Sequence, residues 1–579
     1  MKHDGQQVAE QVAEHLQRIY SDDVDIAQLA KDLCDAMDLE ADQGLERPPR
    51  NLWTQADAWV ICYGDTISRP GEPPLQTLKR VLDEELGGAI SGVHILPFFP
   101  YSSDHGFAVK DYAAVDPKLG GWEDVSALSD SYRVMADLVI NHCSSEHPWF
   151  QAFIAGEGVG QDYFHSLPPD TDLEGVVRPR TSPLLRPTRC AQGEAHVWCT
   201  FSHDQIDLNF ANPAVLLEFA TIMRSMLDQG IRAFRLDAVA FLWKELGTSC
   251  INLPQTHEIV RLLRTLVEAV DPQTILVTET NIPNRENLSY FGNGNEAHIV
   301  YNFSLPPLLL HTLLAGHSGH LKTWLMSMPP AQTGTCFLNF IASHDGIGLR
   351  PAEGLLSEDE TDALIQTSLR SGGQVSWRSL GGQSRPYEIN IALWDALQGT
   401  HQGPDTWQID RFLCAHAIML GLEGLPALYL NSVFATANDQ ERFERTGKNR
   451  SLNRHQWDAD ELSARLGDAQ DPAAIVSSRL RELLALRRQQ PAFHPNATQF
   501  TLHLGDSLFG FWRQSMDRSQ SVFCVSNVTN EPVQLRLDQL NLTVTDDWHN
   551  LIGGRQYASL ADVVDLAPYE TVWISNRPS

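Results

Sequence analysis

The chain has few cysteines, and their spacing forms no motif. Its 579 residues include 9 cysteines, an odd number, and no two of them form a C-x-x-C pair. Zinc ribbons and disulfide-rich secreted domains both depend on closely spaced cysteines, so the sequence excludes both classes. We expect the cysteines to be buried thiols.

Long hydrophobic runs are also missing. No stretch reaches the roughly 18 apolar residues that a membrane-spanning helix requires. The opening residues MKHDGQQVAEQV contain no apolar segment of the signal-peptide type. These two features predict a cytoplasmic protein that does not bind membranes.

Positive charge is scarce in this sequence. It has 43 Lys and Arg residues against 73 Asp and Glu residues, which gives a formal net charge of -30. Nucleic acids and anionic membranes are bound through a basic face, so neither is expected as a partner. The acidic excess is typical of a well-hydrated surface. The oligomeric state cannot be predicted from the sequence.

Apolar runs that alternate with amphipathic stretches are the main positive signal. From residue 59 onward eight short apolar runs are typical of strands, and amphipathic segments such as 215–230 and 257–270 separate them. The eight runs are 59–65, 93–100, 133–142, 231–241, 275–280, 299–307, 336–345 and 425–433. Strands that alternate with helices in this way predict an α/β fold in which a parallel sheet closes into a (β/α)8 TIM barrel.

The rest of the chain divides around this barrel. Two connections between strands are too long for simple loops, so we expect inserted subdomains at the carboxyl ends of the strands. Short strands separated by turn residues follow the last helix and predict a C-terminal β-sandwich. The predicted domains are N-terminal helices (1–54), the barrel (55–142, 213–345 and 409–494), the insertions (143–212 and 346–408) and the C-terminal β domain (495–579).

Charged residues end several of the predicted strands. The fourth strand ends in Arg235 and Asp237, the fifth in Glu279, and the seventh in His344 and Asp345. Because the carboxyl ends of barrel strands meet on one face, the three acids should surround one pocket. A single Arg-x-Asp pair is most often a structural ion pair, whereas several converging acids indicate a functional site.

Two uses of these acids compete. Carboxylates and histidines bind metal ions, but their spacing here matches no metal-binding motif, so no metal is expected. The other use is glycoside chemistry, in which two carboxylates flank the bond that breaks. Arg235 should keep Asp237 ionised, as a nucleophile requires, and the apolar strand before Glu279 should raise its pKa, as an acid catalyst requires.

Four motifs resemble a known family, in the expected order and on the expected strands. The strings that match the four sequence regions of the α-amylase superfamily are DLVINH (137–142), FRLDAV (234–239), TETN (278–281) and ASHDG (342–346). The resemblance implies that Asp237 is the nucleophile and Glu279 the general acid/base. It also implies that Asp345 is a third acid, which binds the sugar and stabilises the transition state.

Further motifs resemble the sucrose phosphorylase branch, whose members transfer glucose to phosphate with retention through a glucosyl-enzyme. They are SSDHGF (102–107), RPR (178–180), VWCTFS (197–202), LGTSC (246–250), FSLPPLLLH (303–311) and KNRSLNR (448–454). The residues that this resemblance implies around the glucose are Asp104, Phe107, His142, Phe201, Arg235, His344 and Arg450. It implies that Arg180 and Tyr387 hold phosphate, which is a substrate, and that no cofactor is used.

The acceptor is implied by departures from sucrose phosphorylases. Those enzymes have an aspartate in place of Arg385 and tyrosines in place of Val177 and Phe241. The string RPYEIN (385–390) instead resembles the glucosylglycerate phosphorylases of the same branch, which implies that Arg385 binds an anionic acceptor such as glycerate. The resemblance also places Glu388 close to the phosphate and acceptor site. A neutral glutamine occupies this position in sucrose phosphorylases, and the sequence offers no physical reason for the change.

The expected reaction is therefore transfer of glucose from 2-O-α-glucosylglycerate to phosphate. Three other readings stay open at this point: a phosphorylase of sucrose or sucrose 6-phosphate, an α-glucoside hydrolase or transglycosylase, and a sugar-binding protein without catalysis. In each of them the ligand is a small sugar. The three acids argue against the last reading, because a binding protein has no need of them.

Overall fold

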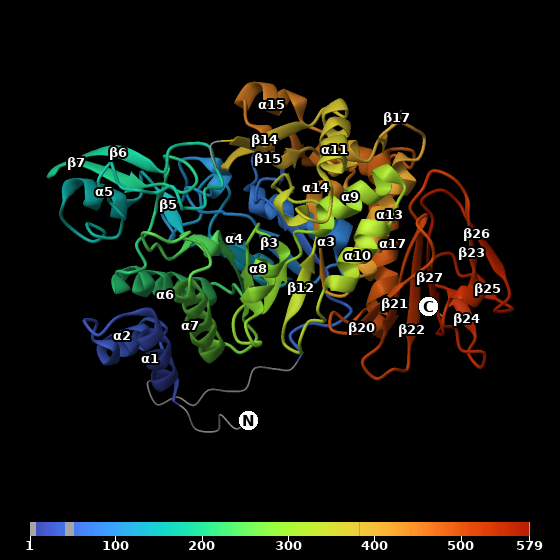
Figure 1. Ribbon diagram of the computed structural model, residues 1–579, viewed down its shortest axis with the longest axis horizontal. Coiled ribbons are helices and arrows are strands. Elements are labelled where there is room, and N and C mark those ends of the chain that lie inside the picture. The colour runs from blue at the N-terminus through green and yellow to red at the C-terminus, as the bar shows by residue number, and fades with distance from the viewer. Residues whose placement is uncertain (1–6, 41–50, 381–382, 578–579) are drawn as a thin grey trace.

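The computed structural model describes residues 7–40, 51–380 and 383–577. Its centre is a closed barrel of eight parallel strands, so the predicted TIM barrel is confirmed (Figure 1). In order around the barrel, the strands are β1 (Trp59–Cys62), β18 (Leu425–Tyr429), β12 (Cys336–Asn339), β11 (Ile299–Tyr301), β10 (Ile275–Thr278), β9 (Ala233–Asp237), β4 (Arg133–Val139) and β3 (Gly92–Ile95). β3 closes the ring by pairing in parallel with β1.

Each strand is shorter than the apolar run that predicts it. The run at 299–307 forms a strand only as far as Tyr301, and the helix α9 (Leu305–Ala315) begins within it. The run at 425–433 likewise divides into β18 and the short helix α14 (Leu430–Val433). A continuous apolar run fits a buried strand and a buried helix equally well, so periodicity alone does not separate them.

Helices surround the barrel and bury their apolar faces against it. They are α3 (Pro74–Leu86), α4 (Trp122–Ser129), α6 (Pro213–Asp228), α7 (Pro254–Val270), α9, α10 (Gly319–Ser327), α13 (Gln408–Gly421) and α17 (Pro472–Arg488). The sequence fits the start of α6, because the Asn212 side chain accepts a hydrogen bond from the amide of Ala214 and Pro213 occupies the first turn. Smaller elements are α8 (Asn284–Leu288), α12 (Leu393–Ala396), α15 (Gln440–Thr446), α16 (Ala459–Leu466), β2 (Ile67–Ser68), β16 (Gly399–Thr400), β17 (Gly403–Pro404) and β19 (Trp457–Asp458).

The N-terminal helices pack on the outside of the barrel. α1 (Val8–Ile19) contacts α7, and α2 (Ile26–Ala36) contacts α6 (Figure 1). Val8, Val12 and Leu16 of α1 are buried, and the His15 ring bonds Glu258 of α7 at 2.7 Å. This pair of helices is therefore packed firmly against the outer helices of the barrel.

Two insertions lie over one end of the barrel (Figure 1). The first contains β5 (His142–Ser144), α5 (Pro148–Ala155), the hairpin β6 (Leu185–Cys190) and β7 (Gly193–Trp198), and β8 (Gln205–Asp207). The second contains β13 (Ile347–Gly348), α11 (Glu358–Arg370) and the hairpin β14 (Gln374–Leu380) and β15 (Gln383–Asn390). They follow β4 and β12, at the carboxyl ends where barrel enzymes form their sites. The exact domain limits stay a prediction.

The C-terminal region is rich in strands, as predicted. One sheet consists of β20 (Thr498–Leu502), β21 (Leu508–Gln514), β22 (Ser521–Asn527), β27 (Thr571–Ser575), β24 (Trp548–Asn550) and β25 (Gln556–Tyr557), and a smaller one of β23 (Val533–Arg536) and β26 (Val563–Leu566). Phe523 and Ile574 of the large sheet share a buried apolar cluster with Leu535 and Leu566 of the small one. This shared cluster makes the region a two-layered β structure.

The structure also bears on the predictions about cysteines and membrane-spanning helices. All 9 cysteines are free, and all but the half-buried Cys190 are buried. Among the described residues, no helix has both the length and the apolar character needed to cross a bilayer.

Candidate active site

The three predicted acids meet at the carboxyl end of the barrel. Asp237 is the last residue of β9, Glu279 follows β10 directly, and Asp345 lies in the loop after β12. They line one small cavity of about 60 Å³. The other predicted residues around this inner cavity are Asp104, Phe107, His142, Arg180, Phe201, Arg235, His344, Tyr387 and Arg450. The convergence expected from strand ends is therefore present in the structure.

A larger outer cavity of about 650 Å³ adjoins the inner one. The two cavities share Asp104, Arg180, Phe201 and Arg450, so they form one site with a narrow inner part and a wide entrance. Glu388 lines the outer cavity. Gln205, which no sequence motif singled out, lines both cavities, and its amide nitrogen lies 3.4 Å from the Asp104 carboxylate.

Three residues at this site have a strained backbone conformation. Asp104, His105 and Ala238 have φ angles of 53°, 50° and 50°, in the left-handed region that residues other than glycine rarely adopt. Each such residue costs about 1–3 kcal/mol and persists only where the surrounding structure holds it. At Ala238 the strain has a visible result, because its amide donates a hydrogen bond to the Glu279 carboxylate at 3.1 Å.

Arg235 lies beneath Asp237 and is fully buried. Its Nη1 donates to Asp237 Oδ1 at 2.7 Å, as the two-residue spacing on a strand predicts. The same nitrogen also contacts Asp137 of β4, which accepts a further hydrogen bond from His94 Nε2 at 2.7 Å. Asp137 belongs to the DLVINH motif, which implied no role for it. The structure shows that Asp137 and Asp237 both pair with Arg235.

Burial alters the ionisation of Asp237 and Glu279. Burial raises the pKa of Asp237 well above its ordinary value, Arg235 opposes this, and the charge of Glu279 adds to the rise. The prediction that Arg235 keeps Asp237 ionised is therefore wrong for the protein without substrate, because burial outweighs the arginine. Burial also raises the pKa of Glu279, as predicted from its apolar strand. Burial therefore favours the neutral form of both carboxyls in the protein without substrate.

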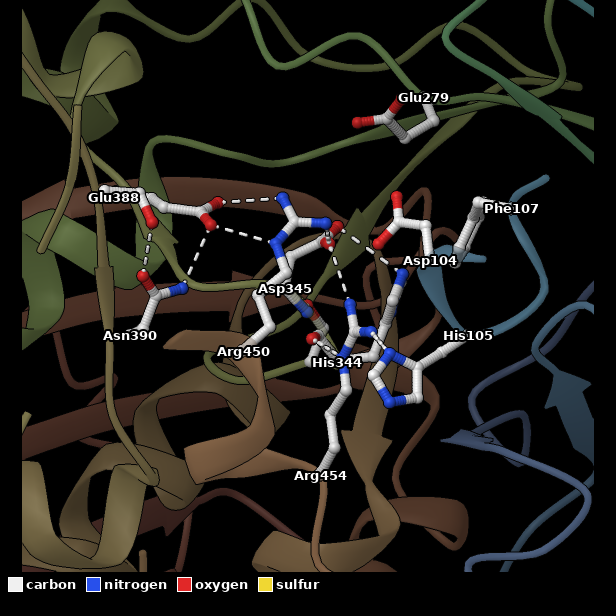
Figure 2. Close-up of polar contacts among 12 residues, drawn as sticks. Asp104, His105, Phe107, Glu279, His344, Asp345, Glu388, Asn390, Arg450 and Arg454 are labelled. Atoms are coloured by element: carbon white, nitrogen blue, oxygen red, sulfur yellow. Dashed lines mark hydrogen bonds and ion pairs between the residues drawn. The ribbon is translucent and has the colours of Figure 1, made fainter. Parts of the chain in front are cut away.

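A chain of ion pairs fixes Arg450 between two acids (Figure 2). Its Nη1 lies 2.7 Å from Asp345 Oδ1, while its Nε and Nη2 donate to the two Glu388 carboxylate oxygens at 2.9 and 3.0 Å. Burial disfavours the charged form of Asp345 and Glu388, but Arg450 outweighs it and holds the pKa of both below the usual range. The structure thus supplies the reason for Glu388 that the sequence lacked: it orients Arg450 by a bidentate pair.

We expect Glu388→Ala to raise the KM for the glucosyl donor about tenfold or more, since a charge-assisted hydrogen bond contributes about 1.5–3 kcal/mol. Glu388→Gln should lie between wild type and Ala, because its amide oxygen still accepts one bond from Arg450. Steady-state kinetics with varied donor measure both. Glu353→Ala is the matched control, because Glu353 pairs with Arg378 of the same insertion outside the cavities. Equal KM values in all three variants would contradict the role of Glu388.

Aromatic and imidazole rings line the inner cavity. Phe107 stacks on His344 with ring centroids 5.3 Å apart and an interplanar angle of 7°. Burial lowers the pKa of His142 and His344, so both rings are neutral and have one N–H each. His142 Nε2 donates to the backbone carbonyl of Phe107 at 3.0 Å, which fixes its orientation. Such a wall of apolar faces and fixed donors suits a sugar ring.

Arg180 reaches the site from the first insertion. Its guanidinium lies 5.2 Å from the ring centroid of Tyr387 and 5.7 Å from that of Phe201. Within the described ranges, neither Arg180 nor the outer-cavity residue Lys448 forms an ion pair, whereas Arg450 is neutralised by two acids. The outer cavity therefore offers two cations that are available to an anionic ligand.

Arg385 is not brought to either cavity. Its side chain is 50% exposed and lies 3.5 Å from the exposed Glu358. The register of the hairpin shifts between Ser376 and Trp377, so that Tyr387 has no direct partner in β14. This β-bulge breaks the alternation of sides along β15 and separates Arg385 from the buried Tyr387. Arg385 therefore does not line the cavities, and its predicted role in acceptor binding stays a prediction.

Asn141 resembles a calcium-binding position of many amylases, and here its oxygen faces a lysine. Lys244 Nζ lies 2.8 Å from Asn141 Oδ1, 2.8 Å from Asp207 Oδ2 and 2.6 Å from the Phe241 carbonyl. Hard metal ions need six or more oxygen ligands, whereas an ammonium group is satisfied by three. The ammonium group of Lys244 therefore occupies the position beside these oxygens that a metal ion would take.

Comparison with known proteins agrees with this geometry. Residues 84–345 match the family model for the α-amylase catalytic domain. A glucosylglycerate phosphorylase of Allomeiothermus silvanus is 44% identical, over 90% of this chain and 91% of that protein. One of Spirochaeta thermophila is 43% identical, over 82% of this chain and 81% of that protein.

Among solved structures, a sucrose 6F-phosphate phosphorylase from Thermoanaerobacter thermosaccharolyticum superposes with a TM-score of 0.71 at 25% identity. The match covers 82% of this chain and 94% of that one. The barrel with three acids at its carboxyl end defines an enzyme that acts on glycosidic bonds. The chain belongs to the α-amylase family, within which it is a glycosyltransferase-type phosphorylase.

Proposed function

We propose that this enzyme transfers glucose from 2-O-α-glucosylglycerate to inorganic phosphate, which yields α-glucose 1-phosphate and glycerate with retention of configuration. The observation that carries the proposal is that three acids and two cations, unpaired among the described residues, line the same site. Asp237, Glu279 and Asp345 line the inner cavity, and the cations Arg180 and Lys448 line the entrance. The first feature suits the glucosyl unit, and the second suits two anions, phosphate and glycerate.

The chemistry proceeds in two steps. In the first, an Asp237 carboxylate oxygen bonds to the anomeric carbon, the bond from that carbon to the glycerate oxygen breaks, and Glu279 gives its proton to that oxygen. In the second, a phosphate oxygen bonds to the anomeric carbon, the bond to Asp237 breaks, and Glu279 takes the proton from phosphate. Glycerate and α-glucose 1-phosphate leave, and the enzyme is restored.

Environment assigns the two roles. Burial raises the pKa of both acids, but Asp237 also contacts Arg235 directly, which favours its charged form. We therefore assign the nucleophile to Asp237 and the transferable proton to Glu279 in the reacting state. Asp345 is held ionised by Arg450 and can stabilise positive charge that develops on the sugar.

Glycerate is favoured over a fructosyl acceptor by two positions at which this chain differs from sucrose phosphorylases. Val177 and Phe241 stand where sucrose phosphorylases have tyrosines, and the Phe241 ring packs edge-on against Phe201 at 5.5 Å. These side chains offer no hydrogen-bond donor to a sugar. An unmet polar group costs about 1–3 kcal/mol, so sucrose should be disfavoured by one or two powers of ten.

A substrate screen tests the proposal directly. Glucosylglycerate, sucrose and sucrose 6-phosphate are each incubated with the enzyme, with and without phosphate, and α-glucose 1-phosphate is assayed. We expect the fastest formation from glucosylglycerate, and none without phosphate. Faster phosphorolysis of sucrose would favour a sucrose phosphorylase instead. Rapid release of free glucose in the absence of phosphate would favour a hydrolase.

Arg180→Ala should make the enzyme use phosphate about 10–100-fold less efficiently, in kcat/KM, because a charge-assisted hydrogen bond to phosphate is worth about 1.5–3 kcal/mol. Slow hydrolysis of the glucosyl-enzyme should persist, since water needs no cation. The ratio of glucose 1-phosphate to glucose, measured at fixed donor and varied phosphate, reports the change. Arg385→Ala is the matched control, because Arg385 is a cation of the same region outside the cavities. If Arg385→Ala shifted the ratio as much as Arg180→Ala, phosphate would not be bound at Arg180.

A further inference from the structure

Three helices bring two histidines and a glutamate together away from the active site. His311 lies on α9, His320 on α10 and Glu360 in the first turn of α11. One potential ligand atom from each residue lies within 4.8 Å of the others. α9 contacts both α10 and α11, so the cluster lies where the second insertion meets the barrel helices (Figure 1).

The spacing of the three groups suits a small tetrahedral ion. His320 Nε2 lies 2.7 Å from Glu360 Oε1, and His311 Nε2 lies 3.9 Å from the same oxygen. Zinc binds nitrogen and oxygen at about 2.0–2.1 Å, which places neighbouring ligand atoms of a tetrahedron about 3.3 Å apart. The distance from His320 to Glu360 is somewhat shorter than this separation, and the distance from His311 to Glu360 is somewhat longer. Small side-chain rotations would therefore bring the three ligand atoms to tetrahedral spacing.

His311 provides independent evidence for a missing ligand. Its side chain is buried, with 4% of the residue exposed, and Nδ1 has no hydrogen-bond partner among the described residues. Its Nε2 faces a carboxylate at a distance too long for a hydrogen bond. In the described part of the chain, the buried ring therefore has an unpaired nitrogen at Nδ1 and no close partner at Nε2, and an ion at Nε2 would add a bond that the folded chain does not supply.

Glu360 is oriented from behind, as metal-binding carboxylates usually are. Its Oε2 accepts hydrogen bonds from the Ser357 amide at 2.8 Å and the Ser357 hydroxyl at 2.7 Å, which leaves Oε1 facing the histidines.

We propose that His311, His320 and Glu360 form a structural site for a divalent transition metal, with zinc the best fit to two imidazoles and a carboxylate. Water completes the tetrahedron. The site is separate from the inner cavity and takes no part in glucosyl transfer. Its effect is to fasten α11 to the barrel helices, and therefore to hold the insertion that also contains Tyr387 and Glu388.

The test uses the full-length enzyme, stripped with EDTA and kept in phosphate-free buffer so that zinc stays in solution. Zinc chloride is titrated in competition with a chromogenic chelator, and the melting temperature is followed in parallel. We expect a single bound ion that raises the melting temperature. His320→Ala and Glu360→Gln should weaken binding about tenfold or more and lose the thermal shift. Glu360→Gln keeps an oxygen for the Ser357 cap, so it guards against simple loss of folding.

His317→Ala is the matched control, because His317 is exposed, lies near the cluster and faces Asp506 at 3.4 Å. It should bind zinc as wild type does. Cobalt should give the visible absorption of a tetrahedral complex in wild type and His317→Ala only. The proposal is overturned if the stripped wild type binds no zinc, if His320→Ala and Glu360→Gln bind it as tightly as wild type, or if His317→Ala weakens it equally.

Discussion

Asp237→Asn should lower the rate of glucosyl transfer on the order of 10⁴-fold or more, with donor and phosphate both saturating. Covalent catalysis has no substitute when its nucleophile is lost, and the amide cannot form a glucosyl ester. The fold should persist, because asparagine has nearly the same shape and its oxygen can still accept the hydrogen bond from Arg235. Initial rates of α-glucose 1-phosphate formation, with circular dichroism melting of the same samples, measure both outcomes.

Asp395→Asn is the matched control for this variant. Asp395 is an aspartate whose pKa burial also raises, and its carboxylate accepts a hydrogen bond from the Asn438 amide outside the cavities. The control should keep nearly full activity. If Asp237→Asn kept a tenth of the wild-type rate, Asp237 would not be the nucleophile.

Glu279→Gln should slow transfer from glucosylglycerate by about 10²–10⁴-fold but change transfer from α-glucosyl fluoride far less. The glycerate oxygen needs a proton as it leaves, whereas fluoride leaves without one. Rates with the two donors at the same pH measure the difference. Glu423→Gln is the control, since burial raises the pKa of Glu423 as well and its carboxylate accepts from the Ala331 amide away from the site.

The pH profile gives a second test of the same residue. A general acid acts in its protonated form, so wild-type kcat/KM should fall as pH rises through the raised pKa of Glu279. Glutamine does not titrate, and this alkaline fall should disappear in the variant with glucosyl fluoride as donor. Equal losses with both donors, or an unchanged alkaline limb, would remove Glu279 from the acid role.

The sequence by itself determined the barrel and the position of the three acids. Periodicity located the eight strands because each is buried and bounded by turn residues. The closed parallel topology then places every strand end on one face, so the acids at Asp237, Glu279 and Asp345 had to meet. Residues at strand ends were predictable because the local sequence pattern determines where each strand ends.

Only the tertiary structure decided which side chains pair across long separations. Glu388 holds Arg450 although 62 positions separate them in the chain, and no local pattern records that pairing. A β-bulge turned Arg385 away from the site, against the two-residue period expected of a strand. Asp137, from the neighbouring strand, also pairs with Arg235. Burial, which depends on packing, is the largest cause of the raised pKa of Asp237. Pairing, bulges and desolvation depend on which elements pack together, and packing is a property of the folded chain.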